Sequence, residues 1–202
     1  NYANIGSIKK NRGDIDSAMY YYKLSMECNK RAGSTTGIGL CHTYFGEIAE
    51  IQGNYTKAIQ EYRKAYDTLA VAGDDWHTLE PLLASARLNL ECNNVEWAKG
   101  LIEIAYERAT SIQSLEHQVE ALRIKALIAE AEGNTPEALT CTKEANMLND
   151  SILTQDKLME MQKMRINYEH ERSSKDLAVL QGKYEYEREH KLMYLVMGLM
   201  AL

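Results

Sequence analysis

The sequence is poor in residues that interrupt helices. Only two of its 202 residues are proline, Pro81 and Pro136. Proline breaks helices, whereas alanine, leucine, glutamate, lysine, methionine and glutamine, which favour them, are abundant here. We therefore expect helix throughout the chain and an all-α fold.

Sequence motifs of catalysis are also missing. There is no phosphate-binding loop, no dinucleotide-binding glycine pattern, no zinc-protease histidine pair and no hydrolase nucleophile elbow. The five histidines are dispersed, and His77 and His117 share a column of the repeat described below. Repeat symmetry explains those two better than a metal does, because ligands spread over successive units would have to converge. We predict no enzymatic activity, no metal site and no cofactor.

Cysteine is scarce, and no two cysteines have the spacing C-x-x-C. We interpret all four as small apolar residues buried inside helices: Cys28, Cys41, Cys92 and Cys141. A disulfide between Cys28 and Cys41, across one turn, is geometrically conceivable. Free thiols are more typical of a reducing compartment.

Positive charge is in short supply over most of the chain. The net charge is −6, and the segment from Gln155 to Lys191 has eight basic and eight acidic residues, so the acidic excess lies in residues 1–154. Binding to a phosphate backbone requires clustered lysine and arginine. We therefore expect no direct nucleic-acid binding by this chain.

What the sequence does contain is a repeat of 40 residues. Small residues recur at this interval in four columns: Gly13, Gly53, Asn93 and Gly133; Ala18, Ala58, Ala98 and Ala138; Gly6, Gly46, Ala86 and Ala126; and Ser25, Ala65, Ala105 and Ala145. Self-similarity at such a period indicates stacked supersecondary units, each burying its apolar face against its neighbours.

Each unit reads as a helical hairpin. In the second unit we expect one helix from about Thr36 to Gln52 and another from about Tyr55 to Ala72, separated by Gly53-Asn54. Glycine takes the left-handed conformation that ends a helix, and asparagine is its usual substitute. The Asp or Asn that follows can accept hydrogen bonds from the amides that open the next helix. The matching turns are Gly13-Asp14, Asn93-Asn94 and Gly133-Asn134.

The small columns predict how the two helices of a unit pack. Gly46 and its equivalents let the paired helix come close, and we expect Ala58 and its equivalents to fill that notch from the other side. Larger residues such as Phe45, Ile59 and Tyr62 then close the second unit. Pro81 falls within the first helix of the third unit, where it either marks a late helix start or kinks the helix.

This pattern resembles the tetratricopeptide repeat: a small residue, a glycine turn, an aromatic residue and then Ala-x-x-x-Tyr-x-x-Ala. The second unit matches best, with Gly46, Gly53-Asn54-Tyr55, Ala58, Tyr62 and Ala65. The resemblance implies an all-α TPR helical-hairpin solenoid of four units in residues 1–150, with units at about 1–33, 34–73, 74–113 and 114–150. The usual unit has about 34 residues, so these units imply extended helices, as in some bacterial signalling members of the family.

The repeat ends before the chain does. Residues 151–191 read as a long, highly charged C-terminal helix. Leu158, Met161, Tyr168, Leu177, Leu180 and Tyr184 approximate heptad spacing, although Arg165 and Arg172 interrupt it. Two interpretations stay open: a homodimer through a coiled coil in residues 155–191, or a solvated capping helix.

The last eleven residues, 192–202, carry no charge. A spanning helix needs about 20 apolar residues, so we interpret this segment as the start of a transmembrane helix, because an apolar circumference suits lipid. The other interpretation is a short helix that docks on the repeats or on a second copy. The first predicts a membrane-anchored protein, periplasmic if a signal peptide was removed. The second predicts a cytoplasmic one.

The expected binding surface is the concave groove formed by the first helices of the units. Residues one turn apart, on the side away from the second helix, are Thr43, Glu47 and Glu50; Leu83, Arg87 and Leu90; and Arg123, Leu127 and Glu130. In the first unit the equivalents are Ala3, Ser7 and Lys10. They mix apolar residues with both signs of charge, as peptide-binding surfaces do. They do not reproduce the Lys/Asn set with which some relatives clamp a terminal carboxylate.

Repeats followed by a charged helix and an apolar segment also resemble bacterial membrane-anchored regulators. The sequence segments that carry this resemblance are Asn167-Tyr168-Glu169-His170-Glu171 and Lys183-Tyr184-Glu185-Tyr186-Glu187. This resemblance implies a protein or peptide interaction scaffold that serves as the sensory module of a signalling or transcriptional regulator. The alternative is a soluble cytoplasmic peptide receptor of the signalling-pheromone type.

Overall fold

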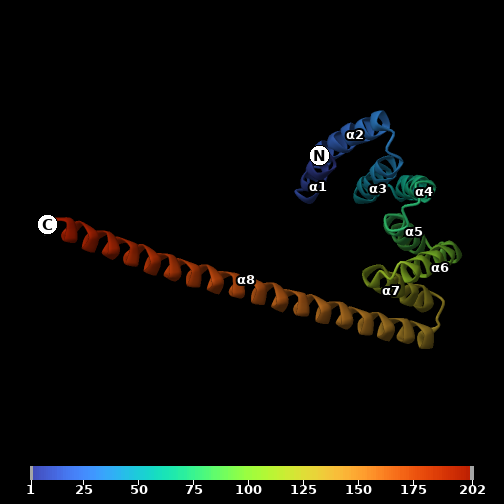
Figure 1. Cartoon of the computed structure of the whole chain (residues 1–202). Coiled ribbons are helices and arrows are strands. Elements are labelled where there is room, and N and C mark those ends of the chain that lie inside the picture. The colour runs from blue at the N-terminus through green and yellow to red at the C-terminus, as the bar shows by residue number, and fades with distance from the viewer. Residues whose placement is uncertain (1, 201–202) are drawn as a thin grey trace. The chain divides into compact units, whose positions relative to one another are not determined.

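The computed structural model describes residues 2–200, and the side chains of these except at positions 187 and 192–200. The described part of the chain is all-α, with eight helices and no strand (Figure 1). Their bounds are α1 Tyr2–Asn11, α2 Ile15–Ala32, α3 Thr35–Ile51, α4 Tyr55–Val71, α5 Leu79–Glu91, α6 Val95–Ser111, α7 Leu115–Ala131 and α8 Thr135–Met200.

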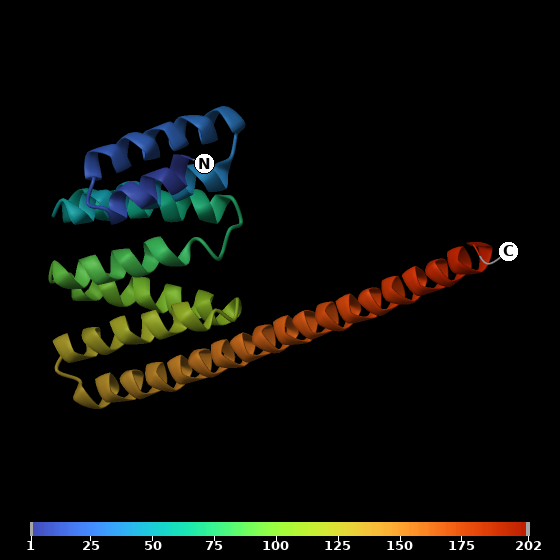
Figure 2. The same cartoon turned by 90° about the vertical axis from the view of Figure 1, so that its left-hand side faces the viewer.

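The chain divides into two compact units, Asn1–Ile152 and Leu153–Leu202. In the first unit, consecutive helices pack against each other, and the contacts are most extensive within the pairs α1–α2, α3–α4 and α5–α6. Figure 2 shows the helices of this unit stacked on one another, from the blue first pair through green to yellow. The alternate helices α3, α5 and α7 also touch one another directly. The first helices of successive pairs therefore form a continuous face.

The turns inside the pairs confirm the glycine column. Gly13, Gly53, Asn93 and Gly133 have φ of 79°, 71°, 61° and 75°, in the left-handed region. A second column, also at an interval of 40 residues, ends the second helices: Gly33, Gly73 and Gln113 have φ of 64°, 69° and 57°. This second column was not among the four predicted from the sequence. Its members set the turns between pairs.

The expected caps after these turns are present in three of four cases. The side chains of Asp14, Asn54 and Asn134 accept hydrogen bonds from the backbone N–H three residues further on. Asn94 makes no such bond. Its amide instead donates to the Asn89 Oδ1 at 3.4 Å, so α6 begins without a side-chain cap.

The notch at Gly46 is filled by a different residue from the one expected. A Cβ at Gly46 would lie 2.5 Å from Cε1 of Tyr62, and a Cβ at Gly6 would lie 2.5 Å from Cε1 of Tyr22. The tyrosine ring, rather than the Ala58 column, therefore occupies the notch. In the third pair the same two positions hold Ala86 and Ile102, both fully buried. Compared with the second pair, the third pair has a larger residue on its first helix and a smaller one on its second helix. The combined volume of the two side chains, here called the pair volume, is therefore conserved.

Pro81 marks a late helix start. Helix α5 begins at Leu79 and has 13 residues, whereas α3, α4, α6 and α7 each have 17. Proline in the first turn costs no hydrogen bond, because the first amides of a helix have no partner within it. Turns at residues 75–78 occupy the place of the missing first turn.

The structure confirms the prediction of burial for two of the four cysteines. Cys41 and Cys141 are buried, whereas Cys28 and Cys92 are exposed, and all four are free thiols. The conceivable disulfide between Cys28 and Cys41 is therefore not formed. Cys92 lies at the end of α5, where the chain turns outward.

The compact unit Leu153–Leu202 is a part of helix α8. The large apolar side chains at its predicted heptad positions are exposed. Leu158, Met161, Tyr168, Leu177, Leu180 and Tyr184 are each more than half exposed. No helix within residues 2–200 holds a stretch long and apolar enough to cross a bilayer. The side chains of the expected membrane segment, residues 192–202, lie outside the described part of the structure.

Candidate binding groove

Two of the nine predicted groove residues belong to the core instead. Thr43 and Leu83 are 0% and 1% exposed. Leu83 packs in a cluster that includes Ala121 and Ile124 of α7, and the Thr43 hydroxyl donates to the Gly39 carbonyl at 3.5 Å. The prediction was wrong here because it considered only the helix within each pair. For Leu83, contact with α7 of the neighbouring pair buries this position of the first helix as well.

The other seven predicted residues reach the surface. Glu47, Glu50 and Arg87 are partly buried, with side-chain exposures of 17%, 22% and 39%. Leu90 is half-buried, and the remaining three are exposed: Arg123, Leu127 and Glu130. We call the surface formed by α1, α3, α5 and α7 the first-helix face.

Charged side chains bridge neighbouring first helices at a fixed step. Lys10 of α1 forms an ion pair with Glu47 of α3, and Arg87 of α5 pairs with Glu50 of α3 at 2.6 Å. Both bridges join residues 37 positions apart. Leu90 and Leu127 occupy the equivalent positions, 40 residues further along than Glu50 and Arg87. The face therefore changes from ion pairs to leucines along the array.

A hollow of about 290 Å³ opens on this face. Its lining combines residues from five helices: Lys10, Glu47, Glu50, Ile51, Tyr62, Glu80, Ala84, Arg87 and Glu120. Glu80, Glu120 and Tyr62 were not among the residues predicted for the groove. Glu80 and Glu120 are 40 residues apart, so the repeat register could have identified them as one column. Tyr62 was assigned to the core, which it fills with its ring while its hydroxyl reaches the hollow.

Hydrogen bonds hold the walls of the hollow. The Tyr62 hydroxyl donates to Oε2 of Glu50 at 2.9 Å, while Arg87 donates to Oε1 of the same carboxylate. Burial and the nearby Glu50 carboxylate raise the pKa of Tyr62, so the phenol stays neutral and remains a donor. Burial alone would lower the pKa of Arg87, but its hydrogen bond to Glu50 raises it.

The carboxyl group of Glu80 holds its proton more tightly than an ordinary glutamate does. Although the Glu80 residue is exposed, partial desolvation of its carboxyl and the adjacent Glu47 raise its pKa to about 7. Glu120 adds further repulsion, and Lys10 opposes it. A carboxyl that hydrogen-bonds another carboxyl needs a proton between them. At neutral pH, therefore, Glu80 is only partly ionised.

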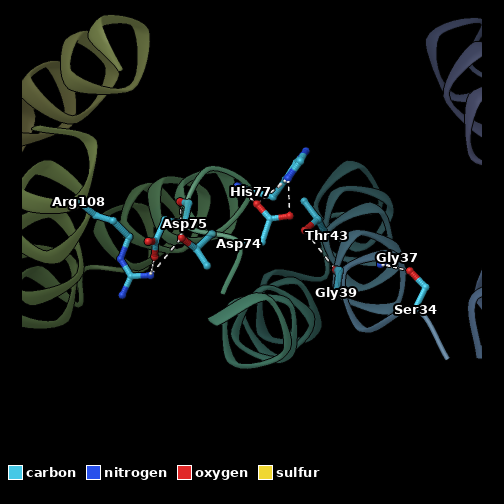
Figure 3. A network of polar contacts seen from close by, with 9 residues as sticks. Ser34, Gly37, Gly39, Thr43, Asp74, Asp75, His77 and Arg108 are labelled. Carbon is cyan, nitrogen blue, oxygen red and sulfur yellow. Dashed lines mark hydrogen bonds and ion pairs between the residues drawn. The ribbon is translucent and has the colours of Figure 1, made fainter. Parts of the chain in front are cut away.

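A separate polar network lies at the turns before α5. Arg108 of α6 donates to Oδ1 of Asp75 at 3.0 Å and to the Thr78 hydroxyl at 3.3 Å. Asp74 accepts from the His77 backbone and contacts its ring. Figure 3 shows the Arg108 and His77 side chains pointing toward these aspartates. The network fixes the turns that replace the first turn of α5, so its role is structural.

Comparison with known proteins finds likeness in structure only. No protein-family model matches the sequence, and no curated protein matches it. Among solved structures, the chain is similar to the crystal structure of BtubC (BKLC) from P. vanneervenii, with 14% identity and a TM-score of 0.66. The match covers 75% of this chain and 63% of that one. At this identity the likeness supports the helical fold alone.

Proposed function

We propose that this chain is a tetratricopeptide-like scaffold that binds an extended segment of a partner protein on its first-helix face. The observation that carries the proposal is the row of side chains bridging α1, α3 and α5 beside an open hollow. The charged residues and leucines of this face recur at a fixed interval, so they can contact the regularly spaced side chains of an extended peptide. Signalling from a bacterial membrane, as the resemblance implies, is the setting in which we propose that this scaffold works, and residues 155–191 are the proposed site of self-association.

The proposal is tested by locating where short peptides bind. Random peptides displayed on phage are selected against the whole chain, and the selected peptides are synthesised. Hydrogen–deuterium exchange then shows which helices they protect. We expect protection on α3, α5 and α7. Protection confined to α2, α4 and α6, or no peptide selected above an albumin control, would overturn the proposal.

Charge reversal at one arginine gives the matched variant. Arg123 is exposed and no ion pair of it is found within the described residues, so Arg123→Glu changes the charge of the face and leaves its bridges intact. Arg87→Glu is the poorer test, because it would place a third carboxylate beside Glu50 and Glu91. Weaker peptide binding by Arg123→Glu at unchanged melting temperature supports the first-helix face as the binding surface.

A further inference from the structure

Helix α1, the first helix of the array, keeps a large apolar side chain exposed. Ile8 is 52% exposed, although it belongs to a column of the 40-residue repeat that is apolar in all four pairs. Its equivalents are 0%, 0% and 3% exposed: Ile48, Leu88 and Ile128. Ile5, about one turn before Ile8, is exposed as well. We call Ile5 and Ile8 the α1 end face.

The buried members of this column all pack against the second helix of the preceding pair. Ile48 of α3 forms one cluster with Ala18 and Tyr22 of α2. The other two contacts are Leu88 with Ala58 and Tyr62, and Ile128 with Ala98 and Ile102. Each time the preceding helix supplies an alanine and, four residues later, a tyrosine or an isoleucine. The α1 end face therefore continues an interface that occurs three times inside the array.

The array ends differently at α8. The fourth pair, formed by α7 and the first turns of α8, keeps the alanine as Ala138, but four residues later it has the exposed Thr142. The exposed Asn146 follows, in the column in which Tyr66 and Tyr106 pack against the next pair. A polar outer face keeps the last unit of a repeat array soluble. Polar residues thus close the α8 end, whereas the α1 end stays apolar.

A second copy of this chain does not offer the helix that the α1 end face would contact. Within the described residues, the pattern of alanine and then tyrosine or isoleucine lies on α2, α4 and α6. These three helices are already covered by α3, α5 and α7. The α8 end, with Thr142, lacks the larger side chain of the pattern. A helix that covers the α1 end face therefore comes from another protein.

From the continuity of this face with the internal interfaces we propose that the α1 end face binds a helix of a partner protein, which carries an alanine and, four residues later, a tyrosine or an isoleucine. Ile8 packs against these two side chains, as Ile48 packs against Ala18 and Tyr22. The contact buries apolar surface of Ile5 and Ile8, which supplies its affinity. This surface lies at the end of the stack, so the inference goes beyond the segment proposed for the first-helix face and does not depend on it.

The test gives the chain the helix that its α8 end lacks. Thr142→Ile and Asn146→Tyr, combined in one double variant, place at the α8 end the residues of the third pair, Ile102 and Tyr106. The α8 end of one copy then carries the pattern that the α1 end face of another copy binds. Because this contact joins unlike ends, it does not close, and the mass of the assembly should rise with concentration.

Sedimentation velocity measures the association of the whole chain at increasing concentrations. We expect the double variant to exceed the wild-type mass at each concentration. Ile8→Glu, added to the double variant, should weaken this association about tenfold or more, as the loss of one buried isoleucine predicts. Ile104→Glu is the matched control, because Ile104 is an exposed isoleucine of α6 outside the α1 end face. It should leave the association unchanged.

Hydrogen–deuterium exchange gives a second readout. Helix α1 should gain protection in the double variant as the concentration rises, and Ile8→Glu should remove that gain. The melting temperature of Ile8→Glu should stay close to that of the wild type, because the side chain is already half exposed. If the double variant melts below the wild type, Thr142→Ile alone takes its place, with the same expected dependence on Ile8.

Three results would overturn the inference. The first is a double variant with the mass of the wild type, and the second is an association that Ile8→Glu leaves unchanged. The third is a wild type whose own association is lost in Ile8→Glu, because a second copy would then occupy the face. Self-association through residues 155–191 is distinguished from all three, since it persists in Ile8→Glu.

Discussion

The packing of Gly46 against Tyr62 predicts the effect of adding one methyl group. In Gly46→Ala the new Cβ would lie 2.5 Å from Cε1 and 2.6 Å from Cδ1 of Tyr62. The ring is 2% exposed, and its hydroxyl is tied to Glu50. The ring therefore cannot move aside without losing contacts or its hydrogen bond.

The expected magnitude follows from two opposing effects. Overpacking costs about 1 to 3 kcal/mol, and the fixed ring places this case near the upper end. Alanine gains about 1 kcal/mol over glycine in a helix. The net loss of stability is about 2 kcal/mol. Tyr62→Ile alone should also cost about 2 to 3 kcal/mol, because it leaves a cavity beside Gly46.

The double variant should be more stable than the two single effects predict. Gly46→Ala with Tyr62→Ile recreates the combination found in the third pair, where Ala86 and Ile102 are fully buried. The added methyl group then occupies space that the ring has vacated. We expect a favourable coupling of about 2 kcal/mol in the double-mutant cycle.

Urea denaturation of the whole chain, followed by the fluorescence of Trp76 and Trp97, measures these free energies of unfolding. Gly100→Ala on α6 is the control, because its Cβ would meet nothing within 4 Å. It should stabilise the chain by about 1 kcal/mol. Additivity of the two changes within about 0.5 kcal/mol would refute the conserved-volume argument.

The remaining predictions concern the turns, the caps and Glu80. Gln113→Gly should raise the melting temperature, because a non-glycine residue at φ 57° costs about 1 kcal/mol; Gln113→Ala, which keeps the strain, should not. Asn54→Ala should cost about 1 kcal/mol in chemical denaturation, and Asn94→Ala much less, because only the first side chain caps its helix. The pKa of Glu80 is raised to about 7 in the folded chain, so the native state binds more protons and stability should fall as the pH rises from about 5 through 7. Thermal melts across that range should show a shallower fall in Glu80→Gln, and an identical slope would contradict the shift.

The repeat interval predicted most of the local structure from sequence. It placed the hairpin turns at Gly13, Gly53, Asn93 and Gly133, and their left-handed conformations confirm it. These features are local, because a backbone with positive φ selects small or amide residues whatever lies around it. The all-helical character follows from composition in the same way.

Contacts between pairs could not be predicted as well. Thr43 and Leu83 have the spacing of surface positions but are buried, Leu83 against α7 of the neighbouring pair, and the Glu80 carboxyl interacts with Glu47 of another helix. Such contacts depend on the angle at which one pair stacks on the next. A sequence repeat gives the number of residues in each pair, but it does not give the angle by which one pair is rotated against the next. Once the structure shows that residues 37 apart meet, the bridges could be read from the sequence directly.

The stacking frame and the binding face are therefore set by different columns. The frame positions conserve pair volume between the second and third pairs, as Gly46 with Tyr62 and Ala86 with Ile102 do, whereas the fourth pair holds Ala126 and an exposed Thr142. The face positions change type along the array, from the ion pairs Lys10–Glu47 and Glu50–Arg87 to leucines at the equivalent positions 90 and 127. A carboxyl with a pKa raised to about 7 lowers the stability of the folded chain at neutral pH, and the frame gains nothing from it. The first-helix face therefore tolerates an unfavourable placement of charge at Glu80 that the packing of the frame does not require, and it is this face that we propose binds the partner segment.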